Sequence, residues 1–183
     1  MPMMMLSLGD FMAIHDRFGK GRHVLKPNDK IYTPERIAKQ MISFYPLSGK
    51  VLDPFRGGGV FYDNLPSDVE SYWCEIDEGE DFFDFNQEID WIISNPPYSI
   101  YDEVMEHSYK ISKNIVYLVP FSKVVSSLGR IKKILNYGNI KSIKIIGASK
   151  CGFPFGFPAC AIHVQKNYRG ETKIEMWDDE CGI

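Results

Sequence analysis

The chain is poor in the features that mark secreted and membrane proteins. Its 183 residues include four cysteines and no CxxC pair, so neither a disulfide frame nor a zinc site is indicated. No apolar run approaches the roughly 20 residues that a membrane helix needs. The start, Met1–Leu8, is rich in methionine but lacks the basic end and cleavage site of a signal peptide. We therefore expect a cytoplasmic protein with no membrane partner and no metal ligands.

Acidic residues are absent from one long stretch. Residues 107–170, the basic block, hold 11 lysines and arginines and no aspartate or glutamate. Residues 51–106, the acidic block, hold 15 acids and 1 base. The formal net charge of -3 is thus an average over blocks of opposite sign. A block of cations favours a polyanionic partner.

Helix-like and strand-like segments alternate after residue 31. The triplet Thr33-Pro34-Glu35 has the residue types of a helix start, with Thr33 as the N-cap. The patterns predict helices at 33–45, 99–112 and 124–136, and strands at 51–52, 71–74, 90–94, 114–119, 142–146, 159–164 and 173–177. Apolar strands that alternate with helices indicate an α/β fold, with a mostly parallel sheet covered on both faces. Residues 1–31 are expected to form an N-terminal basic arm or cap.

The loops after the first strands are the predicted site, because ligands of such sheets bind beyond the carboxyl ends of the strands. The first loop, Asp53-Pro54-Phe55-Arg56-Gly57-Gly58-Gly59, is glycine-rich and lets the backbone approach a ligand. Glu75, followed by Ile76, ends the second strand, where an acid can accept hydrogen bonds from a ribose diol. In Asp81-Phe82, a carboxylate and an aromatic ring can bind the exocyclic amine and the face of an adenine.

The tetrapeptide Asn95-Pro96-Pro97-Tyr98 directly follows the third strand. Two consecutive prolines stiffen the backbone, so the Asn95 side chain and the Pro96 carbonyl keep one direction. Both are hydrogen-bond acceptors and can bind the two hydrogens of an amino group. Tyr98 offers an aromatic face to a planar ring.

Together these motifs resemble the class I S-adenosylmethionine-dependent methyltransferases and, more narrowly, the DNA methyltransferases that modify adenine N6. Asp53–Gly59 is similar to the D-P-F-x-G-x-G cofactor loop of that family, and Asn95–Tyr98 to its N-P-P-Y catalytic motif. The resemblance extends to Tyr32-Thr33-Pro34 and to Gly156-Phe157-Pro158-Ala159. It implies a Rossmann-like methyltransferase fold with a mostly parallel seven-stranded sheet, helices on both faces and a late antiparallel strand. Residues 32–183 would form the catalytic domain.

The resemblance also implies the cofactor, S-adenosyl-L-methionine, and the roles of the site residues. Asn95, Pro96, Pro97 and Tyr98 would be catalytic. The implied cofactor contacts are Tyr32, Thr33 for the methionine end, Asp53 for its amino group, Pro54, Phe55, Gly57, Gly59, Glu75 for the ribose, Ile76, Asp81 and Phe82 for the adenine, and Asn95. The target base would stack on Tyr98 and on Phe155 or Phe157, with Phe153 as a further candidate.

The expected substrate is DNA whose adenine is flipped out of the duplex into this pocket. Cations of the basic block would contact the phosphates, with Lys123, Arg130, Lys132 and Lys133 as the named candidates. The order of the motifs is similar to the gamma arrangement of the family, but the sequence offers no separate target-recognition domain. A homodimer or a separate recognition subunit is therefore a possible partner, and a phage or restriction-modification system a suitable setting.

Three other functions are compatible with the motifs. RNA adenine N6-methyltransferases share the Asn-Pro-Pro motif, so RNA is a possible substrate. A partner-dependent subunit that binds nucleic acid without acting alone would explain the absent recognition domain. Methyltransferases of protein glutamine share N-P-P-Y, although the Asp53-Pro54-Phe55 loop disfavours this function.

Overall fold

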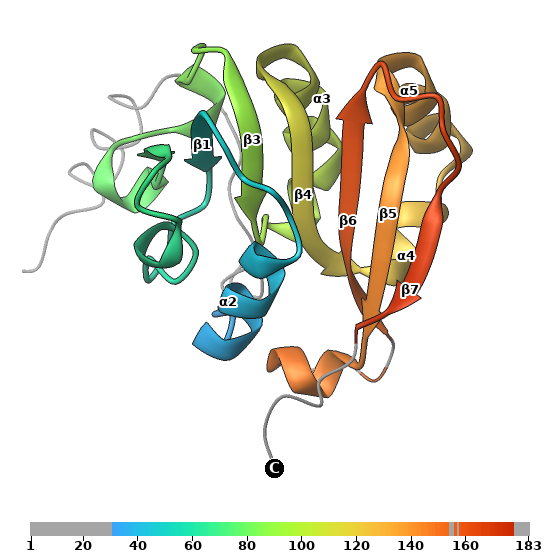
Figure 1. Cartoon of the computed structure of the whole chain (residues 1–183), viewed down its shortest axis with the longest axis horizontal. Coiled ribbons are helices and arrows are strands. Elements are labelled where there is room, and N and C mark those ends of the chain that lie inside the picture. The colour runs from blue at the N-terminus through green and yellow to red at the C-terminus, as the bar shows by residue number, and fades with distance from the viewer. Residues whose placement is uncertain (1–30, 154–155, 157, 178–183) are drawn as a thin grey trace, which may run out of the picture.

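The computed structural model describes residues 31–153, 156 and 158–177. These residues form a seven-stranded sheet with the strand order β2-β1-β3-β4-β6-β5-β7 (Figure 1). The strands are β1 (Lys50–Asp53), β2 (Glu70–Trp73), β3 (Ile89–Ser94), β4 (Ser112–Pro120), β5 (Gly138–Ile146), β6 (Ala159–Lys166) and β7 (Lys173–Met176). Strand β6 is antiparallel to β4 and β5, and the other neighbouring pairs are parallel. The predicted sheet with a late antiparallel strand is confirmed.

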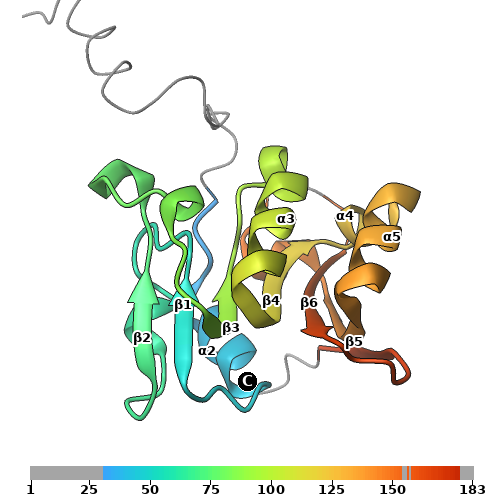
Figure 2. The same cartoon turned by 90° about the horizontal axis from the view of Figure 1, so that it is seen from above.

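Helices lie on both faces of the sheet, as predicted (Figure 2). On one face lies α2 (Glu35–Ser43), and on the other lie α3 (Tyr101–Ile111), α4 (Phe121–Val125) and α5 (Leu128–Tyr137). Short 3-10 turns occur at Tyr62–Asn64, Ile76–Glu78, Phe82–Asp84, Tyr98–Ile100 and Ala148–Cys151. None of the helices in the described ranges is long and apolar enough to cross a membrane.

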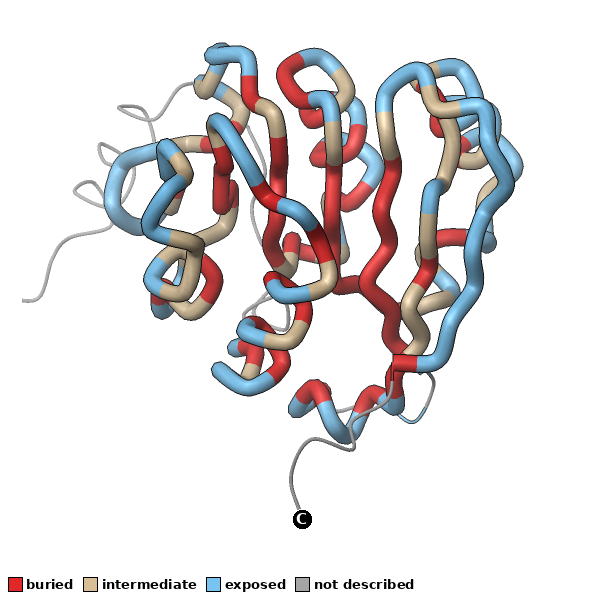
Figure 3. Tube along the Cα trace, in the orientation of Figure 1, coloured by how far each residue is buried: buried red, intermediate tan, exposed pale blue. Residues whose placement is uncertain are grey.

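The central strands β4 and β6 supply both halves of the core. Successive side chains of a strand point to opposite faces. Val116 and Leu118 accordingly pack in the cluster under α2, whereas Ile115 and Tyr117 pack in the cluster under α3. Figure 3 shows β6 buried along most of its length and β7, at the edge of the sheet, exposed.

Two local predictions are wrong. The N-cap of α2 is Pro34, with no side-chain cap, because the Thr33 hydroxyl instead accepts a hydrogen bond from the Asn95 amide. The helix predicted at 124–136 is two helices, α4 and α5. The break lies at Ser127, whose side chain accepts a hydrogen bond from the backbone N–H of Arg130 and so caps a new helix.

Some predictions lie outside the described residues. These are the N-terminal arm up to residue 30, and Phe155 and Phe157, the proposed second stacking residues. Three of the four cysteines are described, and Cys74, Cys151 and Cys160 are free and buried.

Candidate active site

A cavity lies at the carboxyl ends of β1, β2 and β3, where the sequence predicted a site. Ten of the predicted residues line it, namely Tyr32, Pro54, Phe55, Gly57, Glu75, Ile76, Asp81, Phe82, Asn95 and Pro97. These residues come from four separate segments of the chain, and the parallel sheet brings them together. The cavity therefore forms because the strand order places these loops side by side.

The glycine loop is held in place by the carboxylate of Glu75. Gly57 and Gly59 have φ values of 51° and 85°, in the left-handed region that favours glycine. The Gly57 N–H donates a 2.7 Å hydrogen bond to one Glu75 oxygen, and the Asp77 N–H donates to the other at 3.2 Å. Glu75 thus ties the first loop to the second, and its oxygens retain lone pairs toward the cavity.

Asp53 is the anchor beneath this loop. Its carboxylate is fully buried and accepts hydrogen bonds from the Ser94 hydroxyl at 2.6 Å and from the N–H groups of Phe55 and Tyr62 at 3.4 and 3.3 Å. Burial raises the pKa of Asp53 to about 6, against the effect of these three donors. Asp53 does not line the cavity. Its predicted contact with the cofactor amino group therefore stays a prediction, and its observed contacts join the glycine loop to β3 and to the turn that begins at Tyr62.

Aromatic and aliphatic side chains line the same cavity. Phe82 lines it and also packs against Phe55 and His107, with ring centroids 5.2 and 4.7 Å apart. The Asp81 carboxylate accepts a 2.9 Å hydrogen bond from the Phe83 N–H at the cavity wall. Ile76 is 41% exposed and faces the cavity, so an apolar surface remains open beside a carboxylate. Such a pair of surfaces suits a planar ring that carries an amino group.

The side chain of Asn95 is fixed by three hydrogen bonds. Its Nδ2 donates to the Ile31 carbonyl at 3.2 Å and to the Thr33 hydroxyl at 3.1 Å. Its Oδ1 accepts from the Tyr98 hydroxyl at 2.7 Å. Because both N–H groups have partners, the amide cannot turn over without losing two bonds. The Oδ1 atom keeps a second lone pair for another donor.

Tyr98 lies beside this amide and does not line the cavity. Its ring packs edge-on against the buried ring of Phe153, with centroids 6.0 Å apart and an interplanar angle of 85°. Pro96 and Pro97 between Asn95 and Tyr98 are buried. The predicted stacking of Tyr98 on a target base stays a prediction, and the described candidate for the second ring, Phe153, is part of the core.

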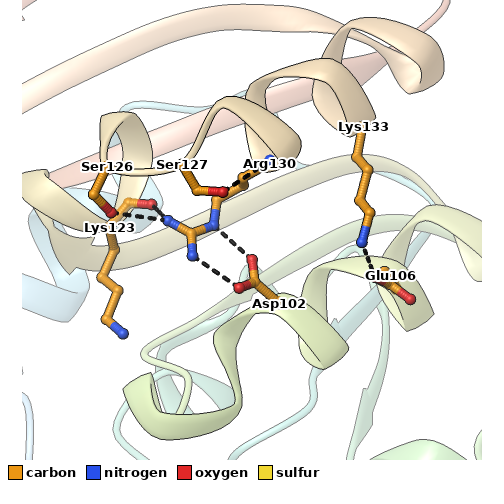
Figure 4. A network of polar contacts seen from close by, with 7 residues as sticks. All are labelled: Asp102, Glu106, Lys123, Ser126, Ser127, Arg130 and Lys133. Carbon is orange, nitrogen blue, oxygen red and sulfur yellow. Dashed lines mark hydrogen bonds and ion pairs between the residues drawn. The ribbon is translucent and has the colours of Figure 1, made fainter.

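The predicted phosphate contacts divide into two kinds (Figure 4). The guanidinium of Arg130 is buried and donates to both Asp102 oxygens, at 2.6 and 2.9 Å, and to the Lys123 carbonyl. Lys133 pairs with Glu106. The Lys123 ammonium, by contrast, points away from this network, and Lys132 is exposed. The cations of Arg130 and Lys133 thus join α5 to α3, while the ammonium of Lys123 takes no part in this network and Lys132 is exposed.

Sequence reasoning missed five residues that line the cavity, Ile31, Asp77, Glu78, Phe83 and Ile100. Asp77 and Phe83 adjoin predicted site residues and Glu78 follows Asp77, so extending the two predicted loops by one or two residues would have found them. Ile100 lies in the turn after Tyr98, and only the fold reveals its position.

No protein-family model matches the chain, and no curated protein sequence matches it. Solved structures do match. A putative class I S-adenosylmethionine-dependent methyltransferase from Listeria monocytogenes is 14% identical, with a TM-score of 0.64 over 92% of this chain and 71% of that chain. The 23S rRNA methyltransferase ErmE is 10% identical, with a TM-score of 0.59 over 81% and 71%. The type IIG restriction endonuclease BpuSI is 14% identical, with a TM-score of 0.57 over 89% of this chain and 28% of that one.

At these identities the similarity establishes the architecture. The chain has the Rossmann-like fold of the class I methyltransferases. Its cavity occupies the position at the carboxyl ends of the strands where sheets of this kind bind their ligands.

Proposed function

We propose that the chain transfers a methyl group from S-adenosyl-L-methionine to the N6 amine of adenine in DNA. The observation that carries this proposal is the fixed Asn95 amide at the cavity wall, within the sequence Asn95-Pro96-Pro97-Tyr98. An oriented carbonyl oxygen beside a cavity with carboxylate and apolar walls suits a reaction between a purine amine and a cationic cofactor.

The residues of the cavity fit S-adenosylmethionine. Glu75 would bind the ribose hydroxyls with its remaining lone pairs, and Asp81 would accept from the adenine amine. Ile76 and Phe82 offer the apolar surface that an adenine ring needs. The bound cofactor would supply a methyl group made electrophilic by a positively charged sulfur. The carboxylates at the site favour a ligand of that charge.

The role of Asn95 is to hold the target amine. The nitrogen of adenine N6 is a poor nucleophile, because its lone pair is delocalised into the ring. Asn95 Oδ1 and the Pro96 carbonyl would accept its two hydrogens and so favour a pyramidal nitrogen. The new bond from nitrogen to the methyl carbon would replace the bond from that carbon to sulfur. Acceptors held in place before the reaction would stabilise the positive charge that develops on this nitrogen, which would then lose one proton to water. A fixed orientation of the two reactants lowers the barrier further.

DNA would bind across the cations that make no ion pair within the described residues, with Lys123 and Lys132 as phosphate contacts. A base inside a duplex cannot reach the cavity, so it must be flipped out at a cost of a few kcal/mol. Stacking on Tyr98 would recover part of that free energy. RNA is the second candidate, since one protein of the same fold is a 23S rRNA methyltransferase.

The test is a methylation assay with the purified chain, labelled cofactor, duplex DNA and structured RNA, followed by identification of the modified nucleoside. We expect N6-methyladenine in DNA. Label in RNA alone would replace DNA with RNA as the substrate. Cofactor binding without methylation of either nucleic acid, even after addition of cell lysate, would contradict the proposal and favour a partner-dependent subunit.

The variant Asn95→Ala isolates the catalytic step. We expect turnover to fall by about 100-fold or more, as when one fixed polar group is removed from an active site. Cofactor affinity, measured by calorimetry, should change little. Asn136→Ala, at an exposed position of α5, is the matched control and should keep full activity. Turnover retained in Asn95→Ala would disprove the proposed role.

A further inference from the structure

The free edge of β7 has the features of a strand that pairs. The Trp177 N–H donates to the Ile145 carbonyl at 2.7 Å, so this residue points toward β5. Residues alternate in direction along a strand, and the backbone groups of Ile174 and Met176 therefore point away from the sheet. Within the described residues no strand pairs with this edge. An unpaired edge of this kind is a template for another chain.

One face of β7 carries apolar side chains that lie beside the core but are exposed to solvent. Ile174 lies beside the buried Ile143 and Met176 beside Ile145, so both are on the face covered by the helices α3 to α5. They are nevertheless 63% and 69% exposed.

Helix α5 presents apolar side chains toward the same edge. Arg130 and Tyr137 contact Asp102 and Tyr109 of α3 and so define the flank that faces the interior (Figure 4). By helical periodicity, Leu128 and Leu135 lie on the opposite flank, the one toward β7. They are 72% and 48% exposed. Helix and edge strand thus border one uncovered apolar surface.

The other face of β7 carries one positive and one negative side chain, Lys173 and Glu175, and Glu175 also pairs with Lys144 of its own chain at 2.6 Å. We propose that two copies of the chain pair through β7, antiparallel and centred on Ile174, into a two-fold dimer with a continuous sheet. In this register Lys173 lies opposite Glu175 of the partner subunit, and the reverse contact follows by symmetry. A register centred on Glu175 would instead place two carboxylates opposite each other, which is unfavourable.

The same register covers the apolar surface. Three strand spacings then separate the two β5 strands, about 14 Å at about 4.8 Å each. The α5 helices, which lie over β5, come near enough for Leu128 and Leu135 of the two copies to approach each other above Ile174 and Met176. The free backbone groups, the opposite charges at positions 173 and 175 and the exposed apolar side chains are all used in this arrangement.

The dimer leaves the candidate active sites apart. The cavity is formed by the loops after β1, β2 and β3, on one side of the sheet. Strand β7 is the edge strand on the opposite side. Activity of each site should therefore not depend on the dimer, and the two proposals fail independently.

The first measurement is the molar mass of the full chain by sedimentation over a range of concentrations. We expect twice the chain mass of 21.0 kDa. Ile174→Asp should shift the protein to monomer, because two charges would meet at the symmetry axis. Lys173→Glu should weaken the dimer at least tenfold. In a Lys144→Gln background, where no cation of the same chain faces position 175, adding Glu175→Lys to Lys173→Glu should restore it. A monomer at all concentrations, or a dimer that Ile174→Asp leaves intact, overturns the proposal.

Cross-linking tests the register itself in a Cys181→Ser background, in which the described native cysteines are buried. Residues directly opposite in a hydrogen-bonded antiparallel pair have Cα atoms about 5.5 Å apart, within reach of a disulfide. Ile174→Cys should therefore cross-link two identical chains under oxidation. Met176→Cys, which lies opposite Thr172, should not. Cross-linking at 176 in place of 174 refutes the register, and unchanged circular dichroism of each variant verifies its fold.

Discussion

The acidic and basic blocks of the chain use their charges in different ways. In the acidic block, the carboxylates of Asp53, Glu75 and Asp81 accept hydrogen bonds from backbone N–H groups and shape the loops of the cavity. In the basic block, several cations instead pair with acids of the acidic block, as in Lys113 with Asp90, Arg130 with Asp102 and Lys133 with Glu106.

This difference shows that charge segregated along the sequence is partly neutralised in space. Asp102 and Glu106 lie one turn apart on α3, opposite Arg130 and Lys133 on α5. The pairs therefore hold two helices of the same face together, in addition to any role toward a ligand. The cations that remain for phosphates are those that point outward, such as Lys132.

Removal of Arg130 is the largest expected disturbance of this arrangement. Arg130→Ala deletes the contacts with Asp102, the Lys123 carbonyl and the Tyr101 ring. We expect the free energy of unfolding to fall by about 3 kcal/mol, because the buried guanidinium loses several charge-assisted hydrogen bonds, whereas Asp102, 52% exposed, stays in contact with water. Urea unfolding measures this change.

Lys133→Ala removes an ion pair in which both side chains are exposed, and it should lower the free energy of unfolding by less than about 1 kcal/mol. Equal losses in the two variants would contradict the structural role of Arg130.

The pH dependence of the Arg130 effect has a definite sign. The Arg130 guanidinium lowers the pKa of Asp102 below its ordinary value. The Asp102 contribution to stability is therefore present above the unfolded pKa and is lost as the pH falls through the folded pKa. The difference between wild type and Arg130→Ala should shrink below about pH 4.

Asp53 offers the matching test in the acidic block, with a slightly smaller expected effect. Burial raises its pKa to about 6, above its unfolded value. The folded state then binds the proton more tightly, so the contribution of Asp53 to stability is greatest below about pH 4 and declines as the pH rises to about 6. For a shift of about two units this decline is about 2–3 kcal/mol.

The measurement compares wild type with Asp53→Asn by urea unfolding at pH 4 and pH 7. The stability of wild type relative to the variant should be higher at pH 4. Asp68→Asn removes the same charge at an exposed position and serves as the control. A pH-independent difference would mean that Asp53 is not a buried anchor of the glycine loop.

The sequence predicted the sheet and the position of the cavity, because both depend on local patterns. Apolar runs define the strands, and motifs at their carboxyl ends meet wherever a parallel sheet forms. Ten predicted residues accordingly line the cavity. Asp53 was assigned to the ligand by resemblance alone, and its depth below the loop depends on packing that no local pattern encodes.

Contacts between distant segments were beyond local reasoning. Thr33 has the residue type of an N-cap, yet its hydroxyl binds Asn95, 62 positions further along the chain. Arg130 was predicted to contact phosphates, as one of the cations of the basic block. A usable signal existed, since Arg130, Ile134 and Tyr137 share one face of a helix, while Asp102 and Glu106 share a face of another.

The smallest predicted effect concerns the binding of nucleic acid by the exposed cations of the basic block. This prediction rests on the proposed function. Lys132 is exposed and makes no ion pair within the described residues, whereas Lys133 pairs with Glu106. Lys132→Ala should leave stability unchanged within about 0.5 kcal/mol. It should reduce the slope of log affinity for DNA against log salt by about 0.9, as expected for one lost phosphate contact.

Lys133→Ala should reduce the slope less, because Glu106 already neutralises that cation. Fluorescence anisotropy of labelled DNA across a salt series measures both slopes. Equal changes in the two variants would show that the ion pair with Glu106 does not keep Lys133 from binding phosphate.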